Sequence, residues 1–386
     1  MITDTTSLVG LCERLATADY ITVDTEFLRD STYYAKLCLV QIAGPDEAAV
    51  IDTLAPGIDL SPLFALLNDA PPVKVFHAAR QDIEIFVGLT GRVPQPLFDT
   101  QVAAMVCGFG DSVGYDKLVA ALTTGQIDKS SRFTDWSRRP LSDKQIAYAL
   151  ADVTWLRPIY EALDAKLVER SRHGWLDEEM AILSDPETYR TEPDQAWRRI
   201  KVRSGDRRTL AVLQSVAAWR ERQAQIKDVP RSRVLKDESL AEVATRQPKT
   251  VDDLTRLRGV HQGMVRGRVG EDLIAAVKAA LATPPSDWPT PPKKPDLPRG
   301  LAPTVDLLRV LLKLKAETHD VAPKMIATGD DLDHLAADDD AAIPALHGWR
   351  RAVFGEDALR LKHGKIGLFV EAGTIKLARR PADQTG

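Results

Sequence analysis

The chain has 386 residues, which is enough for two or three domains. Its composition, 44% hydrophobic and 27% charged, is ordinary for a soluble protein, and it contains neither a run of roughly 18 apolar residues nor a basic and apolar leader. We therefore expect a cytoplasmic protein without membrane contact, and the three scattered cysteines fit a reducing compartment and exclude a zinc ribbon.

The net charge of −4 is distributed unevenly along the chain. Residues 1–184 carry 16 Lys/Arg against 26 Asp/Glu, residues 197–283 carry 19 against 10, and residues 296–386 carry 13 against 14. An acidic first part binds a polyanion poorly unless metal ions offset its charge, whereas the basic middle part suits contact with nucleic-acid phosphates. The same excess is also typical of a solvated surface, so charge alone does not decide the function.

The first part begins with strands. Residues 20–28, 36–44 and 48–52 read as three strands close in sequence, which favours an antiparallel meander, and a fourth strand is expected near 73–77. In ITVDTEFL, Asp24 and Glu26 are two residues apart and therefore share one face of the strand. Asp82 opens the helical run QDIEIFVGL, where an acid also suits the positive end of a helix. On its own Asp82 could be a helix cap.

A later helix carries two more polar side chains. Ser142 followed by Gln145 is a capping-box start, and Tyr148 and Asp152 are four residues apart, so they are neighbours on the helix surface. Taken alone, an acid pair such as Asp24 and Glu26 is usually part of a solvated strand face, and a pair such as Tyr148 and Asp152 is usually no more than two neighbours on a helix. Together, four carboxylates and a phenol in apolar segments predict a site for a divalent metal, because unpaired buried charge is costly.

This ordered set resembles the DEDD superfamily of 3′→5′ exonucleases in its tyrosine-bearing branch, and within it the bacterial ribonuclease D family. The resemblance extends over roughly residues 1–180 and includes DTEFLRDSTYYAKLCLVQIA, FDTQVAA and DKSSRFTDWSRRPLSDKQIAYALADV. It implies an α/β ribonuclease H-like exonuclease domain with a mixed sheet and flanking helices. All five expected positions carry the family's residues.

The resemblance also implies roles. Asp24, Glu26 and Asp152 would hold the Mg²⁺ or Mn²⁺ ion that generates the attacking hydroxide. Asp24 would bridge to a second ion, on which Asp82 would act partly through water. Tyr148 would orient the nucleophilic water, since a phenol with a pKa near ~10 is a poor base at neutral pH.

Substrate contacts are expected around these residues. Phe27 and Leu28 follow the acid pair and should lie near the terminal nucleotide, although plain strand packing would also explain them. His77 in FHAARQD is a candidate near the scissile phosphate, with a structural histidine as the alternative. Arg138 and Arg139 could meet phosphates, or be solvated in their loop.

Beyond the nuclease part we expect helices. A linker at 185–206 leads to 207–285, where VPRSRVLKDESLAEVATRQP resembles the helicase-and-RNase-D C-terminal (HRDC) domain. A proline-rich linker at 286–300 precedes residues 301–386, expected to form a second, diverged HRDC-like helical domain whose end, GKIGLFVEAGTIKLARR, could form strands. The expected fold is thus a ribonuclease H-like domain followed by two mainly α-helical HRDC-type domains.

The resemblance implies a two-metal-ion 3′→5′ exoribonuclease that releases 5′-mononucleotides and trims the 3′ ends of tRNA precursors and other small structured RNAs. Two alternatives remain at this point: a 3′→5′ DNA exonuclease, since the acids do not distinguish sugars, or a nucleic-acid-binding adaptor with an inactive nuclease core. We expect a monomer, because the spaced modules could form a ring within one chain.

Overall fold

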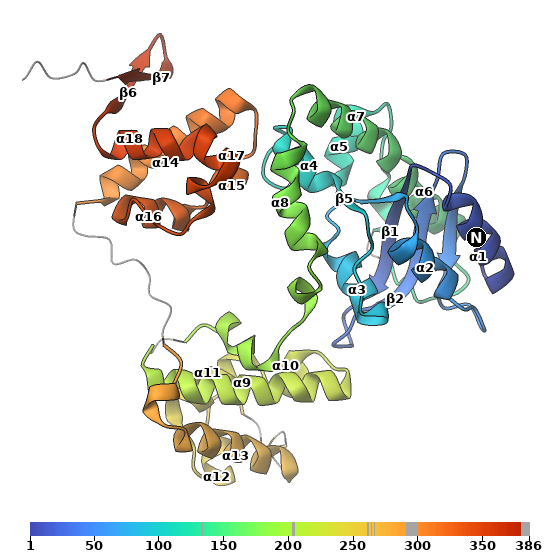
Figure 1. Cartoon of the computed structure of the whole chain (residues 1–386). Coiled ribbons are helices and arrows are strands. Elements are labelled where there is room, and N and C mark those ends of the chain that lie inside the picture. The colour runs from blue at the N-terminus through green and yellow to red at the C-terminus, as the bar shows by residue number, and fades with distance from the viewer. Residues whose placement is uncertain are drawn as a thin grey trace, which may run out of the picture.

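The structure is a computed structural model that describes residues 1–132, 134–202, 205–260, 262, 263, 265, 267–290 and 300–379. Figure 1 shows three bodies along the chain: an α/β part, the helices α9–α13, and the helices α14–α18. In the described part, none of the helices is long and apolar enough to cross a membrane.

The α/β part is built on one five-stranded mixed sheet with the strand order β3-β2-β1-β4-β5. β1, β2 and β3 form the expected antiparallel meander, while β4 and β5 run parallel to β1. The four strands expected from the sequence are confirmed to within about one residue at their ends. The strands are β1 (Tyr20–Leu28), β2 (Lys36–Ala43), β3 (Ala48–Asp52), β4 (Val73–Phe76) and β5 (Leu97–Asp99).

Helices cover both faces of this sheet, because its central strands are apolar on both sides. One face, with Ile21 and Val23 of β1, packs against α1 (Thr5–Leu15), α2 (Ser61–Asp69) and α3 (Arg80–Thr90). The other face, which carries Asp24 and Glu26, meets α6 over β1–β3. The remaining elements of this part are α4 (Thr100–Val106), α5 (Tyr115–Leu122), η1 (Lys129–Ser131), α6 (Asp143–Thr154), α7 (Leu156–Glu169) and α8 (His173–Ser184).

The middle part is helical and has a core of its own. Two short segments precede it, and the second contributes buried Trp197 and Ile200 to that core, so residues expected to be a linker pack against α9. The elements are η2 (Pro186–Tyr189), η3 (Pro193–Arg199), α9 (Arg207–Lys227), α10 (Arg231–Val234), α11 (Asp237–Arg246), α12 (Val251–Thr255), α13 (Arg268–Ala282) and η4 (Pro285–Asp287). Of the proline-rich segment expected at 286–300, residues 291–299 lie outside the described residues.

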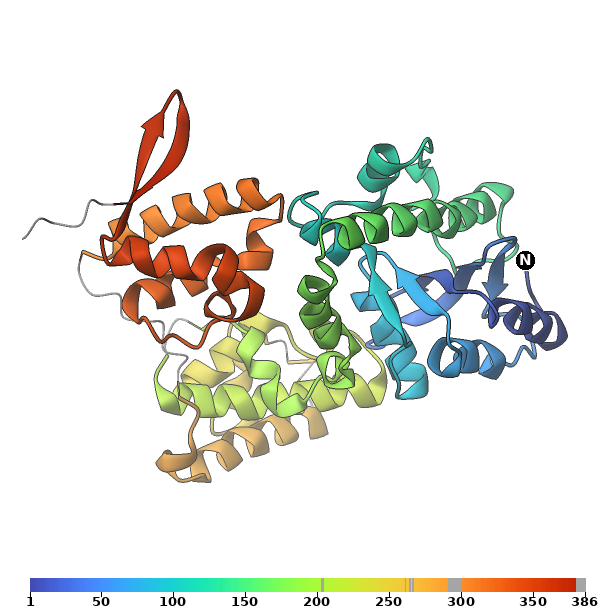
Figure 2. The same cartoon turned by 45° about the horizontal axis from the view of Figure 1, so that its top comes forward.

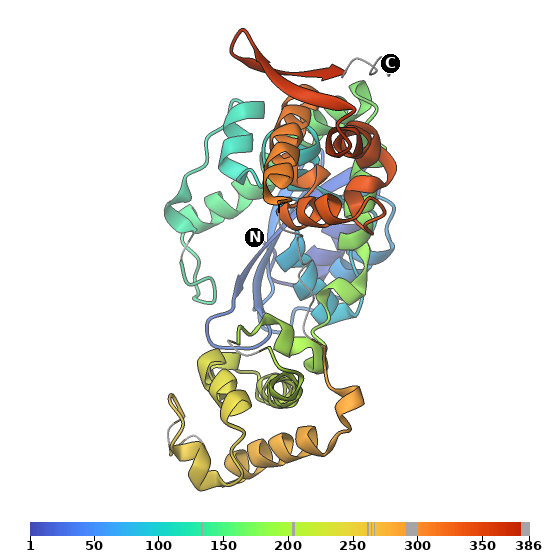
Figure 3. The same cartoon turned by 90° about the vertical axis from the view of Figure 1, so that its left-hand side faces the viewer.

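The last part is a helical body that ends in a hairpin, as the sequence suggested for its final segment. Figure 3 shows this hairpin projecting from the helices. The elements are α14 (Ala302–His319), α15 (Pro323–Ile326), α16 (Gly329–Ala337), η5 (Pro344–Leu346), α17 (Gly348–Arg350), η6 (Arg351–Gly355), α18 (Glu356–Lys362), β6 (Ile366–Glu371) and β7 (Thr374–Arg379).

The last part docks on α8, which Figures 1 and 2 show on the side of the nuclease part that faces α14–α18. The rings of Trp175 and Trp349 stack with their centroids 4.2 Å apart. Buried Arg350 pairs with Glu178 and with Glu179, the latter at 2.7 Å. These contacts connect the two parts through one continuous hydrophobic core.

The middle part docks on the turn between β1 and β2 (Figure 3). The backbone N–H groups of Tyr33 and Tyr34 each donate to a carboxylate oxygen of Asp228 at 3.0 Å. The Tyr33 hydroxyl binds buried Glu221, and the Arg231 guanidinium lies 4.7 Å from the centre of the Tyr33 ring. The hairpin that carries the acidic pair therefore also holds the first helical part.

Candidate active site

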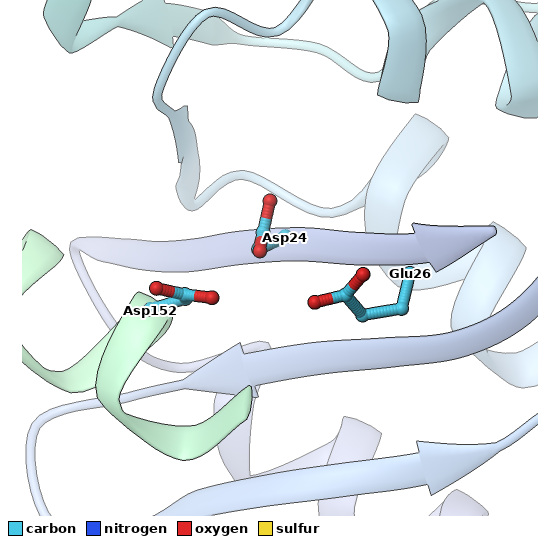
Figure 4. A group of neighbouring side chains, drawn as sticks. All are labelled: Asp24, Glu26 and Asp152. Atoms are coloured by element: carbon cyan, nitrogen blue, oxygen red, sulfur yellow. The ribbon is translucent and has the colours of Figure 1, made fainter. Parts of the chain in front are cut away.

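Three carboxylates from two elements meet on one face of the sheet (Figure 4). Asp24 and Glu26 project from β1, Asp152 projects from α6, and one oxygen of each lies within 4.8 Å of the others. The alternation of β1 places the first two on the same face. The hydroxyl of Thr22, also on that face, donates to the carbonyl of Val153 at 2.8 Å and anchors α6 beside them.

The three carboxyl groups hold protons more tightly than ordinary acids do. Burial raises the pKa of Asp24 to about 6. Burial and the charge of Asp24 raise the pKa of Asp152 to about 8. Burial, followed by the charges of Asp24, Asp152 and Asp82, raises the pKa of Glu26 to about 10. A divalent cation would supply the missing positive charge, and its preferred ligands are oxygens of this kind. The donor set therefore fits Mg²⁺ or Mn²⁺.

Asp82 lies near this group but outside it. Its buried carboxylate accepts a hydrogen bond from the hydroxyl of Thr25, whose side chain alternates to the opposite face from Asp24 and Glu26. Burial, then the charge of Asp24, raises the pKa of Asp82 well above its usual range. The structure thus brings three of the four expected acids together and keeps the fourth within electrostatic reach.

Tyr148 lies one helical turn before Asp152 on α6 and hydrogen-bonds to it. Burial, then the charges of Asp152, Glu26 and Asp24, raises the pKa of this phenol above its usual value. The phenol therefore keeps its proton at neutral pH and acts as a hydrogen-bond donor.

A cavity of about 290 Å³ opens beside these groups, and Asp24, Tyr148, Asp152 and His77 line it. His77 Nδ1 lies 3.0 Å from the hydroxyl of Thr100. Burial lowers the pKa of His77, which leaves the ring neutral.

Phe27 and Leu28 do not line that cavity. Both are half-buried, Phe27 against the α1–α3 core and Leu28 against the core that contains Trp136. Their positions match the strand-packing alternative.

The turn that presents His77 is held by a buried carboxylate that sequence reasoning did not single out. Asp99 accepts the backbone N–H groups of Ala78 and Ala79 at 3.0 and 2.9 Å. Ala78 has φ of 57°, in the left-handed region that residues with a Cβ rarely adopt. This turn fixes one wall of the cavity.

Two further cavity residues were also missed. The hydroxyl of Tyr115 contacts the backbone carbonyls of Ala151 and Asp152 at 3.0 and 2.8 Å, and so holds the end of α6 that carries Asp152. The positive charge of Arg132 opposes the rise in the pKa of Glu26 and Asp152. Arg132 stands within the quoted DKSSRFTDW segment, but no spacing rule singled it out. The sequence around Tyr115, which follows Gly114, contains no motif that indicates a role for this tyrosine.

The loop arginines have different environments. Arg139 is bound by buried Asp52 through two hydrogen bonds of 2.7 and 2.6 Å, which makes it a structural residue. Arg138 is exposed and pairs with Asp135 at 3.1 Å.

Comparisons with known proteins agree with this geometry. Residues 1–168 match the family described as 3′-5′ exonuclease, and residues 209–277 match the HRDC domain. The chain is 50% identical to a ribonuclease D of Acidiphilium cryptum over 99% of this chain and 97% of that protein. It is 52% identical to a ribonuclease D of Gluconacetobacter diazotrophicus over 97% of this chain and 96% of that protein.

The chain belongs to the ribonuclease D family. The crystal structure of Escherichia coli RNase D, described as an exoribonuclease involved in structured RNA processing, superposes with a TM-score of 0.79 at 31% identity, covering 94% of this chain and 98% of that one. The predicted ribonuclease D family and the nuclease fold followed by an HRDC domain are confirmed. Divalent metals are implied by the family, and the three-carboxylate group is the candidate site for them.

Proposed function

We propose that this member of the ribonuclease D family is a metal-dependent 3′→5′ exoribonuclease that trims the 3′ ends of structured RNAs, such as tRNA precursors, and releases 5′-mononucleotides. The observation that carries the proposal is the meeting of Asp24, Glu26 and Asp152 within 4.8 Å at the edge of a cavity. Folding alone does not explain such a group, because three buried carboxylates repel one another and so oppose folding.

In the proposed site, Asp24, Glu26 and Asp152 would hold the divalent ions, and Asp82, which is bound to Thr25 on the opposite face of β1, would act on them through water. When bound, the ions lower the pKa of the attacking water and neutralise charge on the leaving 3′-oxygen. The carboxylates are held in fixed positions because the two elements that carry them are restrained. β1 is the central strand of the sheet, and α6 is hydrogen-bonded to Thr22 and Tyr115.

Tyr148 serves as a donor that orients the water rather than as a base. Its raised pKa keeps the phenolic proton in place, and its position one turn from Asp152 brings the hydroxyl to the acid group. The neutral His77 and the positive Arg132 stand on the cavity wall, where the one would donate or accept a hydrogen bond and the other would meet a phosphate. Phe27 and Leu28 would contribute to nucleotide binding indirectly, by packing β1 in place, rather than by lining the cavity.

We also propose the domain limits 1–184, 207–285 and 301–386, with the last as a second, diverged HRDC domain, and a monomeric protein. The intramolecular docking of both helical parts on the nuclease supports the monomer. Light scattering coupled to size-exclusion chromatography tests this, and a dimer mass would contradict it.

Digestion of 3′-labelled and 5′-labelled RNA and DNA of matched sequence tests the activity. With Mn²⁺ or Mg²⁺ we expect mononucleotides from the 3′ end of RNA and none in the presence of a chelator. Asp152→Asn should abolish hydrolysis while RNA binding is retained. Equal degradation of DNA would support the DNA exonuclease instead, and RNA binding without any mononucleotide release would support the adaptor.

A further inference from the structure

One fully buried amide beside the acidic group has no partner. Gln41 lies in the middle of β2 with its side chain inaccessible to solvent. Within the described part of the chain, neither its Nε2 nor its Oε1 makes a hydrogen bond. A buried polar group without a partner destabilises a fold by about 1–3 kcal/mol. An apolar side chain of the same size would serve folding better at this position.

The strand register places this amide against the metal-binding carboxylates. Gln41 is the direct cross-strand partner of Asp24. Such partners point to the same face of the sheet, with Cβ atoms about 4.5–5.5 Å apart. Figure 4 shows Asp24 gathered with Glu26 and Asp152, so the register places Gln41 on the face where these three carboxylates meet.

The other neighbours offer the amide little. Along β2, the residues on the same face are Leu39 and Ala43, and Val50 lies opposite on β3. Ala149 of α6 packs into the core that contains Leu39 and Val50. Thr22 shares the face, but its hydroxyl already donates to α6. The charged acceptors on this face are the carboxylates of Asp24, Glu26 and Asp152, and Asp24 is the one directly opposite Gln41.

Asp24, in turn, has little hydrogen bonding to stabilise its charge. Asp24 is stabilised by the backbone N–H of Thr25, and burial outweighs that single interaction. A carboxylate that binds a metal through one oxygen is usually fixed by a hydrogen bond to the other oxygen. An amide without an acceptor thus stands opposite a carboxylate that needs a donor.

We propose that Gln41 is a positioning residue whose Nε2 donates to the carboxylate of Asp24 when that group binds a divalent ion, so that the second oxygen faces the ion. This inference rests on the proposed metal-dependent function and adds to it a residue that makes no contact with RNA. It also explains why β2 has an amide at a position whose neighbours on β2 and β3, Leu39, Ala43 and Val50, are apolar.

The test is the affinity of the full-length protein for Mn²⁺, measured by isothermal titration calorimetry and by the rise in melting temperature on adding Mn²⁺. Gln41→Met keeps the length and volume of the side chain but removes the donor. The matched control is Ile42→Met, the next residue on β2, which is equally buried but faces the α1–α3 core. Gln41→Leu repeats the test if the methionine variant does not fold.

We expect Gln41→Met to weaken Mn²⁺ binding about 10–100-fold and Ile42→Met to leave it unchanged. The Mn²⁺ concentration that gives half-maximal hydrolysis should rise in parallel. The metal-free Gln41→Met protein should be at least as stable as the wild type, because an unpaired amide has been removed. A Gln41→Met affinity within twofold of the wild type overturns the assignment. If the wild type itself binds no Mn²⁺, the proposed function fails as well, so the two failures are distinguishable.

Discussion

The acidic group should destabilise the metal-free fold, and removing one of its charges should reveal how much. Asp152→Asn replaces a buried carboxylate by a neutral amide of nearly the same shape. In the folded protein, burial and the charge of Asp24 raise the pKa of Asp152 from 3.8 to about 8. We therefore expect a variant that loses metal-dependent hydrolysis but gains stability when metal is chelated.

The direction of this stability change follows from proton binding. Between about pH 4 and pH 8 the folded carboxyl of Asp152 keeps a proton that the unfolded chain has lost, so the folded state binds more protons and stability falls as pH rises. Each unit of pKa corresponds to about 1.4 kcal/mol, which gives an upper bound of about 6 kcal/mol above pH 8. The amide of asparagine is also buried among polar groups, so we expect a net gain of about 2–4 kcal/mol.

Thermal unfolding in a chelating buffer at pH 8 measures this gain. One kcal/mol shifts the melting temperature of a domain of 150–250 residues by about 2–4 °C, so the variant should melt at least about 4 °C higher. The difference should shrink as the pH is lowered towards about 4, where both states are protonated. Adding Mn²⁺ should stabilise the wild type more than the variant.

Asp52→Asn is the control, with the opposite expected sign. Although burial opposes it, hydrogen bonding from Arg139 lowers the pKa of Asp52. Its loss should therefore lower the melting temperature at pH 8. An Asp152→Asn protein that is less stable than the wild type in the chelator, or a difference that does not depend on pH, would refute the electrostatic reasoning.

Three further outcomes are expected. Tyr148→Phe should lower kcat about 10–100-fold with little change in RNA affinity, because the phenol orients a water rather than binding the chain; single-turnover kinetics and a binding assay separate the two. Arg132→Ala should raise KM and reduce the dependence of RNA binding on salt, since one phosphate contact is lost; an unchanged salt slope would count against that contact. Tyr33→Phe should speed hydrogen exchange in residues 29–35 and around Asp228, because buried Glu221 loses a donor; an exchange pattern identical to that of the wild type would show that this contact does not hold the docked helices.

The local parts of the site could be read from the sequence. Asp24 and Glu26 share a face because a strand alternates, and the capping box of Ser142 and Gln145 forms as expected at the start of α6. Because Tyr148 and Asp152 are four residues apart on this helix, they lie on one side of it. These inferences needed only the periods of a strand and a helix.

The missed parts depend on pairing between distant elements. Gln41 stands opposite Asp24 only because of the register of β1 with β2. Tyr115 reaches the end of α6 because α5 is placed beside it by the fold. Asp82 is held by Thr25, on the face of β1 opposite to the one that carries the other acids. No local pattern specifies such contacts, so sequence periodicity could not separate Asp82 from the other acids or find Gln41.

The hairpin β1–β2 connects the acidic site with the first helical part, and the chemistry of its turn makes that connection specific. Glu221 of α9 is completely buried, and although burial opposes it, hydrogen bonds from Arg231 and Tyr33 lower its pKa. Without the tyrosine, one donor to a buried carboxylate would be missing, which is costly. The same strand that holds Asp24 therefore sets where the basic helices stand.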